Sequence, residues 1–179
     1  MKYGKLLAIL LAVALLAGCA TGQTAPETTQ PLREAVGEFL VDGKPVGTDP
    51  TAAVYAAKDI IYYEAGKDFT YGEGEKEDEH TAEEAAAHMV VHITKPGTYS
   101  ITGKLSKGQI AVDLGEDAKD DPNAVVTLVL DGLDLTCRVA PAVIFYNVYE
   151  SGQPNGPAGA NVILAPGSTN RVVGSHTEE

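Results

Sequence analysis

Residues 126–136 read Val-Thr-Leu-Val-Leu-Asp-Gly-Leu-Asp-Leu-Thr, with apolar and polar residues alternating on both sides of Gly132. This pattern is typical of two short β-strands joined at a glycine. The same order of apolar strand, glycine and second strand occurs at residues 90–102 (VVHITKPGTYSIT) and at residues 161–173 (NVILAPGSTNRVV). The glycines of the three units, at positions 97, 132 and 167, are spaced 35 residues apart. The sequence therefore predicts a repeated β-structure, with a positive φ at each of these glycines.

A single unit of this kind is too small to bury an apolar face. Stacked units bury a continuous core and form backbone ladders between successive units. We therefore expect a mostly β fold, a partial parallel β-helix, over residues 88–179. A β-sandwich is the alternative, because its strands are also short and bounded by glycine.

The N-terminus has the features of an export signal. Lys2 and Lys5 precede an apolar run from Leu6 to Leu16, which is shorter than the roughly 20 residues that span a bilayer as a helix. The run ends in Leu-Ala-Gly-Cys at positions 16–19, which resembles the lipobox of bacterial lipoproteins. The resemblance implies that residues 1–18 are a cleaved signal helix and that Cys19 is lipidated. We therefore expect a protein anchored in the cell membrane by lipid, on its extracytoplasmic face.

Two segments lie between the signal and the repeats. Residues 19–36 are rich in Thr, Pro and Gln and are predicted to be a flexible tether. Residues 37–87 are predicted to be a short, irregular capping region. Within it, Asp42-Gly43 indicates a hairpin turn, residues 52–63 give mixed helix and strand signals, and the capping box at residues 81–84 predicts a short helix through about Ala87.

The composition limits the partners. The net charge of −12 repels phosphate backbones, so nucleic acid is not an expected partner. The same charge would also repel an anionic polysaccharide unless a divalent cation lay between them.

Four segments together resemble a family of bacterial carbohydrate-binding domains found on secreted and lipid-anchored proteins of clostridia and their relatives. They are residues 96–113 (PGTYSITGKLSKGQIAVD), 129–136 (VLDGLDLT), 140–143 (APAV) and 164–170 (LAPGSTN). The resemblance implies a right-handed parallel β-helix like that of pectate lyases, bound calcium, and affinity for plant cell-wall polysaccharides. Members of the family carry further coils, so the β-helix domain of residues 88–179 is expected to be incomplete and the chain to be an N-terminal fragment.

Candidate calcium ligands lie in an acidic loop after a predicted strand. Calcium prefers six to eight oxygen ligands, largely carboxylates and carbonyls. The candidates are Asp113, Asp117, Asp120 and Asp121. Their spacing does not match an EF-hand, and a solvated loop is the alternative. Asp131 and Asp134 are interpreted as residues that satisfy turn amides.

Aromatic side chains are the usual platforms for sugar rings, and the chain has eight Tyr, three Phe and no Trp. Tyr146 and Tyr149, which follow an apolar strand, are the candidate carbohydrate-binding residues; packing on the coil is the alternative. His88 and His92 are four residues apart, but a strand would place them about 13 Å from each other, which argues against a shared zinc site. Cys137 is predicted to be a small buried residue.

The sequence shows no nucleophile elbow, phosphate loop or ordered Ser, His and Asp set. Lys95, Lys104, Lys107 and Arg138 are not paired with acids in a pattern diagnostic of a lyase. The prediction is a surface-anchored, non-catalytic protein that binds polysaccharide with the help of calcium. A polysaccharide lyase fragment, and a structural or adhesive surface protein without a sugar site, are the alternatives.

Overall fold

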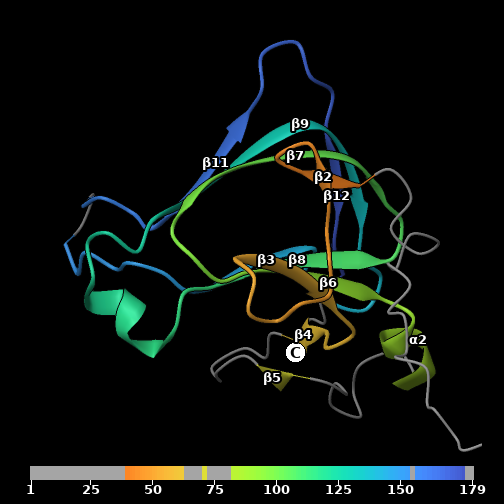
Figure 1. Cartoon of the computed structure of the whole chain (residues 1–179), viewed down its shortest axis with the longest axis horizontal. Helices are drawn as coiled ribbons and strands as arrows, with labels where there is room; N and C mark the ends of the chain where they lie inside the picture. Colours follow the sequence, from red (N-terminus) through yellow and green to blue (C-terminus); the bar gives the residue numbers. More distant parts are fainter. Residues whose placement is uncertain (1–38, 63–69, 72–81, 154–155, 176–179) are drawn as a thin grey trace, which may run out of the picture.

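The computed structural model describes residues 39–62, 70–71, 82–153 and 156–175, and within them two β-sheets face each other across an apolar core (Figure 1). A short helix, α2 (Ala82–Ala86), and a 3-10 helix, η1 (Glu116–Asp120), lie beside the sheets. The prediction of a mostly β fold is confirmed, as is a short helix before Ala87. The predicted signal helix lies outside the described residues.

The larger sheet contains six described strands in the order β11-β9-β7-β1-β2, with β12 also paired to β9. Its longest strands are β7 (Gly97–Leu105) and β9 (Val126–Thr136). The others are β1 (Leu40–Val41), β2 (Lys44–Pro45), β11 (Ala160–Leu164) and β12 (Arg171–Val173). The pairs β7–β9, β9–β11 and β9–β12 are parallel, whereas β1 lies antiparallel to both β7 and β2.

The smaller sheet contains four described strands in the order β10-β8-β6-β3. They are β3 (Val54–Ala57), β6 (Met89–Ile93), β8 (Gly108–Asp113) and β10 (Val143–Asn147). Here β6, β8 and β10 are parallel and β3 is antiparallel. A two-stranded ribbon of β4 (Ile61–Tyr62) and β5 (Thr70–Tyr71) lies beneath this sheet (Figure 1).

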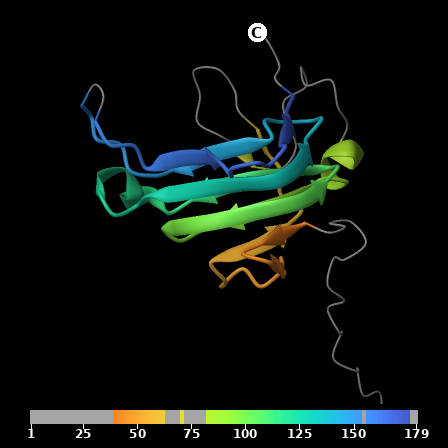
Figure 2. The ribbon, with the colours of Figure 1, turned by 90° about the horizontal axis from the view of Figure 1, so that it is seen from above.

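From β6 onward the chain alternates between the two sheets. It passes from β6 to β7, β8, β9 and β10, and then to β11 and β12, and each strand from β8 to β11 pairs in parallel with the strand two before it. Seen from above, β7, β9 and β11 lie side by side as a ladder, with β1 and β2 at one end (Figure 2). Each pair of strands therefore extends both sheets by one strand.

The strand register corrects the first of the three predicted units. Gly97 pairs with Val126, not with Gly132, and residues 90–93 belong to β6 in the other sheet. Both strands of the third unit pair with the second unit, as a stacked repeat requires, with Val126 opposite Ala160 and Leu135 opposite Val172, although neither pair has the predicted 35-residue spacing. The 35-residue glycine spacing was misleading because the connections differ in length, from two residues before β8 to twelve before β9.

The positive φ predicted for the three glycines is confirmed. Gly132, however, does not join two separate strands. Gly97, Gly132 and Gly167 have φ values of 155°, 76° and 76°. Gly132 lies inside β9, where the ladder to β7 shifts register between Ile101 and Gly103. It therefore belongs to a bulge within a strand. The Asp42–Gly43 hairpin is also confirmed, since both residues have positive φ, as a two-residue type I′ turn requires.

The side chains between the sheets are almost entirely aliphatic. Ile101, Leu128 and Leu135 from the larger sheet and Ile93 and Ile110 from the smaller one are fully buried. On the other face of the smaller sheet, buried Gln109 bonds to a neighbouring segment. Its Oε1 accepts from the Ile61 amide at 2.9 Å, and its Nε2 donates to the carbonyls of Ile61 and Pro141 at 2.8 Å each.

Candidate functional site

The outer face of the larger sheet carries the polar side chains of its strands, because buried and exposed residues alternate on either side of the bulge at Gly132. On β7, Tyr99, Ile101 and Leu105 are buried, whereas the adjacent Thr98 and Lys104 are exposed. On β9 the alternation is the same, with Leu128 and Leu130 buried and the intervening residues partly exposed. Successive side chains of a strand point to opposite faces, so the exposed set shares the outer face of the sheet.

Parallel register aligns these outward residues in three rows that run across β7, β9 and then β11 or β12. Residues paired across neighbouring strands lie about 5 Å apart on the same face. The rows are Thr98, Thr127 and Asn161; Ser100, Val129 and Ile163; and Lys104, Asp134 and Arg171. We call these nine residues the outer-face rows.

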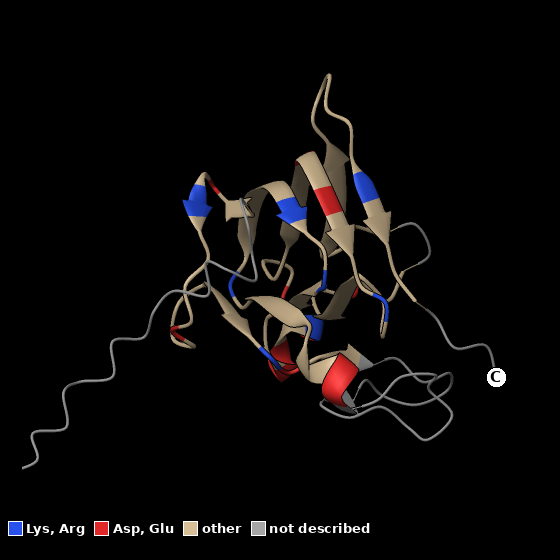
Figure 3. Cartoon of the chain, turned by 90° about the vertical axis from the view of Figure 1, so that its right-hand side faces the viewer, with Lys and Arg blue, Asp and Glu red and all other residues tan. Residues whose placement is uncertain are grey.

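The third row is a chain of ion pairs. Lys104 Nζ lies 3.4 Å from Asp134 Oδ2, and Arg171 Nη1 lies 3.1 Å from Asp134 Oδ1. Arg171 Nη1 also donates to Thr136 Oγ1 at 3.0 Å. The hydrogen bond from Arg171, with a smaller contribution from Lys104, lowers the pKa of Asp134 below its usual value. Basic and acidic segments accordingly lie next to one another across these strands in Figure 3.

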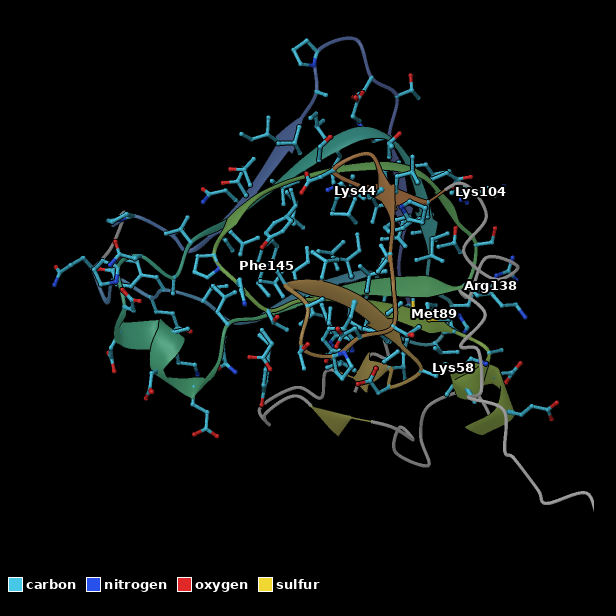
Figure 4. The ribbon with its side chains drawn as sticks, in the orientation of Figure 1. Lys44, Lys58, Met89, Lys104, Arg138 and Phe145 are labelled. Carbon is cyan, nitrogen blue, oxygen red and sulfur yellow. The ribbon has the colours of Figure 1, made fainter. Side chains whose placement is uncertain are left out.

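The charges on this sheet are mixed, because the exposed carboxylates of Asp42 and Asp131 lie on it together with these cations. Two cations flank one carboxylate, and Lys44 on β2 lies on the same sheet; Figure 4 shows Lys44 and Lys104 there. The side chains of Lys104 and Arg171 are 66% and 61% exposed. They can therefore donate hydrogen bonds to a ligand, while the Thr98, Ser100, Thr127 and Asn161 side chains both donate and accept. Such a surface suits a hydroxyl-rich, extended ligand.

Sequence reasoning missed this row. Asp134 was interpreted as a turn residue, and Lys104 was considered unpaired with acids. The available signal was the period-2 alternation of residues 98–104 and of residues 133–136 after Gly132, which places both residues outward. Pairing them, however, required the strand register, because Lys104, Asp134 and Arg171 are separated by unequal lengths of chain.

The predicted calcium ligands do not form one cluster. Asp113 ends β8, where its Oδ1 accepts from the Gly115 amide at 3.0 Å and from Asn147 Nδ2 at 2.8 Å. Asp117 and Asp120 lie in η1, and Asp121 Oδ1 accepts from the amide and side chain of Asn123. Within the described ranges, no three Asp, Glu, His or Cys side chains are grouped as a metal site would require.

The two candidate sugar-binding tyrosines do not belong to the outer-face rows. Tyr146 belongs to β10 in the smaller sheet and is partly buried against the core. Tyr149 is also partly buried; its backbone N–H donates to the Ala124 carbonyl at 3.0 Å, and its carbonyl accepts from Gly159.

The two histidines are buried and have separate partners. His92 Nε2 lies 2.8 Å from Asp59 Oδ1, and its ring stacks on Tyr55 with the centroids 4.7 Å apart. Burial, with the nearby Asp59 and Asp113 charges, raises the pKa of Tyr55. His88 Nε2 accepts from the Arg138 amide, and its Nδ1 lies 2.8 Å from the Glu84 carbonyl. Both side chains link segments of the fold to one another.

Of the two cysteines, only Cys137 lies within the described residues. Cys137 is fully buried, as predicted, and burial raises the pKa of its thiol. Cys19, the predicted lipidation site, lies outside the described residues. Among the helices that the structure describes, none is long and apolar enough to cross a membrane.

Comparison with known proteins gives one family. No curated protein and no solved structure matches the chain. A family model described as "carbohydrate-binding domain-containing protein" matches residues 87–179, about half of the chain. This region includes every strand from β6 to β12 and all nine residues of the outer-face rows. The chain therefore belongs to this family of carbohydrate-binding domain-containing proteins.

Proposed function

We propose that the chain is a non-catalytic, surface-anchored module that binds a plant cell-wall-type polysaccharide along the outer-face rows. The observation that carries this proposal is the set of outer-face rows, which lie within the family match and include two cations beside Asp134. A polysaccharide offers many hydroxyl groups along an extended chain. The row of Thr98, Thr127 and Asn161, the row of Lys104, Asp134 and Arg171, and Ser100 offer hydrogen bonds along such a chain, and Val129 and Ile163 offer apolar contacts between them.

We also propose that the two sheets are walls of a right-handed parallel β-helix. The support is the alternation of the chain between sheets and the parallel pairing of each strand with the strand two before it. An antiparallel β-sandwich would instead join many neighbouring strands by hairpins. Here the described hairpins, β1–β2 and β4–β5, both lie before residue 82.

We also propose that a lipid on Cys19 attaches the chain to the extracytoplasmic face of the cell membrane. This proposal rests on the sequence of residues 1–19. Calcium assistance rests on the family resemblance alone, because Asp113 and Asp121 already accept local hydrogen bonds and the four candidate carboxylates are not grouped.

Sedimentation with insoluble polysaccharide tests the binding face. The full chain is mixed with insoluble glucan or with calcium-pectate, and the bound fraction is measured. Replacing both Lys104 and Arg171 with Ala should weaken binding by about tenfold or more, since a hydrogen bond to a charged group contributes about 1.5–3 kcal/mol. Lys119→Ala, which removes an exposed cation on η1, is the matched control and should bind like the parent.

Other results would redirect the proposal. A loss of binding in Tyr149→Ala but not in the Lys104/Arg171 double variant would move the site to the tyrosines. If chelator releases the bound chain and calcium restores it, the calcium prediction is supported. Absence of binding to both polymers would contradict the proposed function, and release of unsaturated oligosaccharides, detected by ultraviolet absorbance, would identify a lyase.

A further inference from the structure

The bulge in β9 separates its pairing with β11 from its pairing with β12. Two residues of β9, Asp131 and Gly132, lie opposite the single residue Thr102 of β7. On the other edge of β9, the ladder to β11 ends at Leu130 and the ladder to β12 begins at Asp134. The backbone of β9 therefore needs hydrogen-bond partners other than a regular ladder in the gap between these two residues.

The side chain of Asn170 bonds to both sides of this gap. Its Oδ1 accepts from the Leu133 amide at 2.8 Å, and its Nδ2 donates to the Leu130 carbonyl at 3.1 Å. Nδ2 also donates to Ser168 Oγ at 2.7 Å, and this hydroxyl in turn donates to the Ala165 carbonyl at 2.8 Å. Asn170 thus joins the end of one ladder to the start of the next.

This network fixes the orientation of the Asn170 amide. The Leu133 N–H is a donor and the Leu130 carbonyl is an acceptor, so the reverse orientation would oppose two donors at one end and two acceptors at the other. An aliphatic or a carboxylate side chain could not make the same set of bonds, because neither offers N–H donors.

The residue after Asn170 is Arg171, which begins β12 and is one of the two cations of the outer-face rows. Arg171 pairs in register with Asp134, and its Nη1 lies 3.1 Å from Asp134 Oδ1. Because β12 is only three residues long, few backbone bonds hold its register. The bond from Leu133, the residue directly before Asp134, therefore holds the start of β12 where Arg171 meets Asp134.

We propose that Asn170 is a positioning residue of the outer-face rows, which holds Arg171 in place for a ligand. Asn170 is only partly exposed, and its amide donates to Leu130 and Ser168, which leaves Arg171 as the group that reaches the ligand. The ligand itself rests on the proposed function, whereas the placement of Arg171 can be measured without any ligand.

Titration of the Asp134 carboxyl by carbon-13 NMR, on the full chain in mild detergent, tests the placement of Arg171. In the parent, the hydrogen bond from Arg171 is the main cause that lowers the pKa of Asp134. Asn170→Ala should raise this pKa toward its ordinary value of 3.8, and adding Asn170→Ala to Arg171→Ala should cause no further rise. Gln109→Leu, which removes hydrogen bonds at the smaller sheet, controls for a general loss of stability and should leave the pKa of Asp134 unchanged.

Sedimentation with insoluble glucan or calcium-pectate measures the effect on the proposed binding. Arg171→Ala should weaken binding by up to about tenfold, since it removes a charged hydrogen-bond donor. Asn170→Ala should weaken it by at least about threefold in the parent but not in the Arg171→Ala background, because the two residues act as one unit. A purely structural role would instead give additive losses. Gln153→Ala, which removes an exposed amide outside the outer-face rows, should bind like the parent.

A second variant covers the case in which the alanine variant does not fold, which a thermal melt detects. Asn170→Ser keeps one hydroxyl that can donate or accept, so it should shift the pKa of Asp134 in the same direction by a smaller amount. An unchanged Asp134 pKa in a folded Asn170 variant overturns the proposal, and so does an additive loss of binding in the double variant. If the parent binds neither polymer, the proposed function fails, and the titration still decides whether Asn170 positions Arg171.

Discussion

Replacing Gly132 with valine should destabilise the fold through backbone conformation alone. Gly132 has a φ of 76°, in the left-handed region, and a Cβ added there would find only Thr102 Oγ1 within contact range, at 3.8 Å. The site therefore has room for a side chain, so the cost comes from the backbone. A left-handed conformation costs an L-residue about 1–2 kcal/mol, and a β-branched residue more, so we expect a loss of at least about 2 kcal/mol for Gly132→Val.

Thermal melting followed by circular dichroism measures the effect. For a chain of this size, each kcal/mol shifts the Tm by roughly 2–4 °C, so Gly132→Val should melt about 4–8 °C or more below the parent. Gly132→Asn should lose less, because Asn tolerates the left-handed region. Gly47→Ala is the control: its φ lies outside that region and no atom lies within 4 Å of the added Cβ, so its stability should be unchanged or slightly higher. A Gly132→Val protein that melts like the parent, or a Gly47→Ala protein that loses as much, would refute the proposed bulge conformation.

Gln109→Leu should lose about 2–4 kcal/mol in urea unfolding, because it leaves buried polar groups of Ile61 and Pro141 without their partner, whereas exposed Gln153→Leu should change little. Equal losses in the two variants would contradict this role. Cys19→Ser should release the chain from membranes, since it removes the predicted lipid acceptor but keeps the export signal; continued partitioning with detergent-extracted membranes would exclude the lipoprotein assignment. The pKa of Asp134 is lowered in the folded state, so its ion pairs stabilise the fold above its unfolded pKa of 3.8 and the contribution disappears as the pH falls through the lowered value. The difference in Tm between the parent and Asp134→Asn should therefore be present at neutral pH and vanish in acid; a pH-independent difference would contradict the ion pairs.

Local features of the fold were predictable from the sequence, whereas long-range ones were not. The Asp42–Gly43 turn and the positive φ at Gly132 depend on backbone sterics of one or two residues, and both were predicted correctly. The phase of the repeat depends on which strands pair. Unequal connections hide that pairing, so the first unit was misplaced. Residues 52–63 gave mixed signals and contain the short strands β3 and β4, whose pairing is also long-range.

In the candidate site, too, local features were predictable and long-range ones were not. Alternation along the strand is enough to place Thr98 and Lys104 outward, but the meeting of Lys104, Asp134 and Arg171 is a consequence of register in three strands. The acidic residues chosen as calcium ligands were close in sequence, yet Asp113 and Asp121 each serve their own turn. Sequence proximity in an irregular loop does not indicate that side chains converge, because the loop backbone directs each of them separately.

The parallel pairing has a consequence for the way this chain is made. Every parallel strand from β8 onward pairs with a strand that precedes it in the sequence. A polypeptide that emerges from its N-terminus first therefore presents a formed sheet edge before the next strand appears, and each new strand is added to an existing template. Assembly can proceed in the direction of synthesis without waiting for a distant C-terminal partner. The antiparallel β1 and β3 are different: β1 can pair with β2 at once, but its other edge and β3 wait for β7 and β6, which follow later in the sequence.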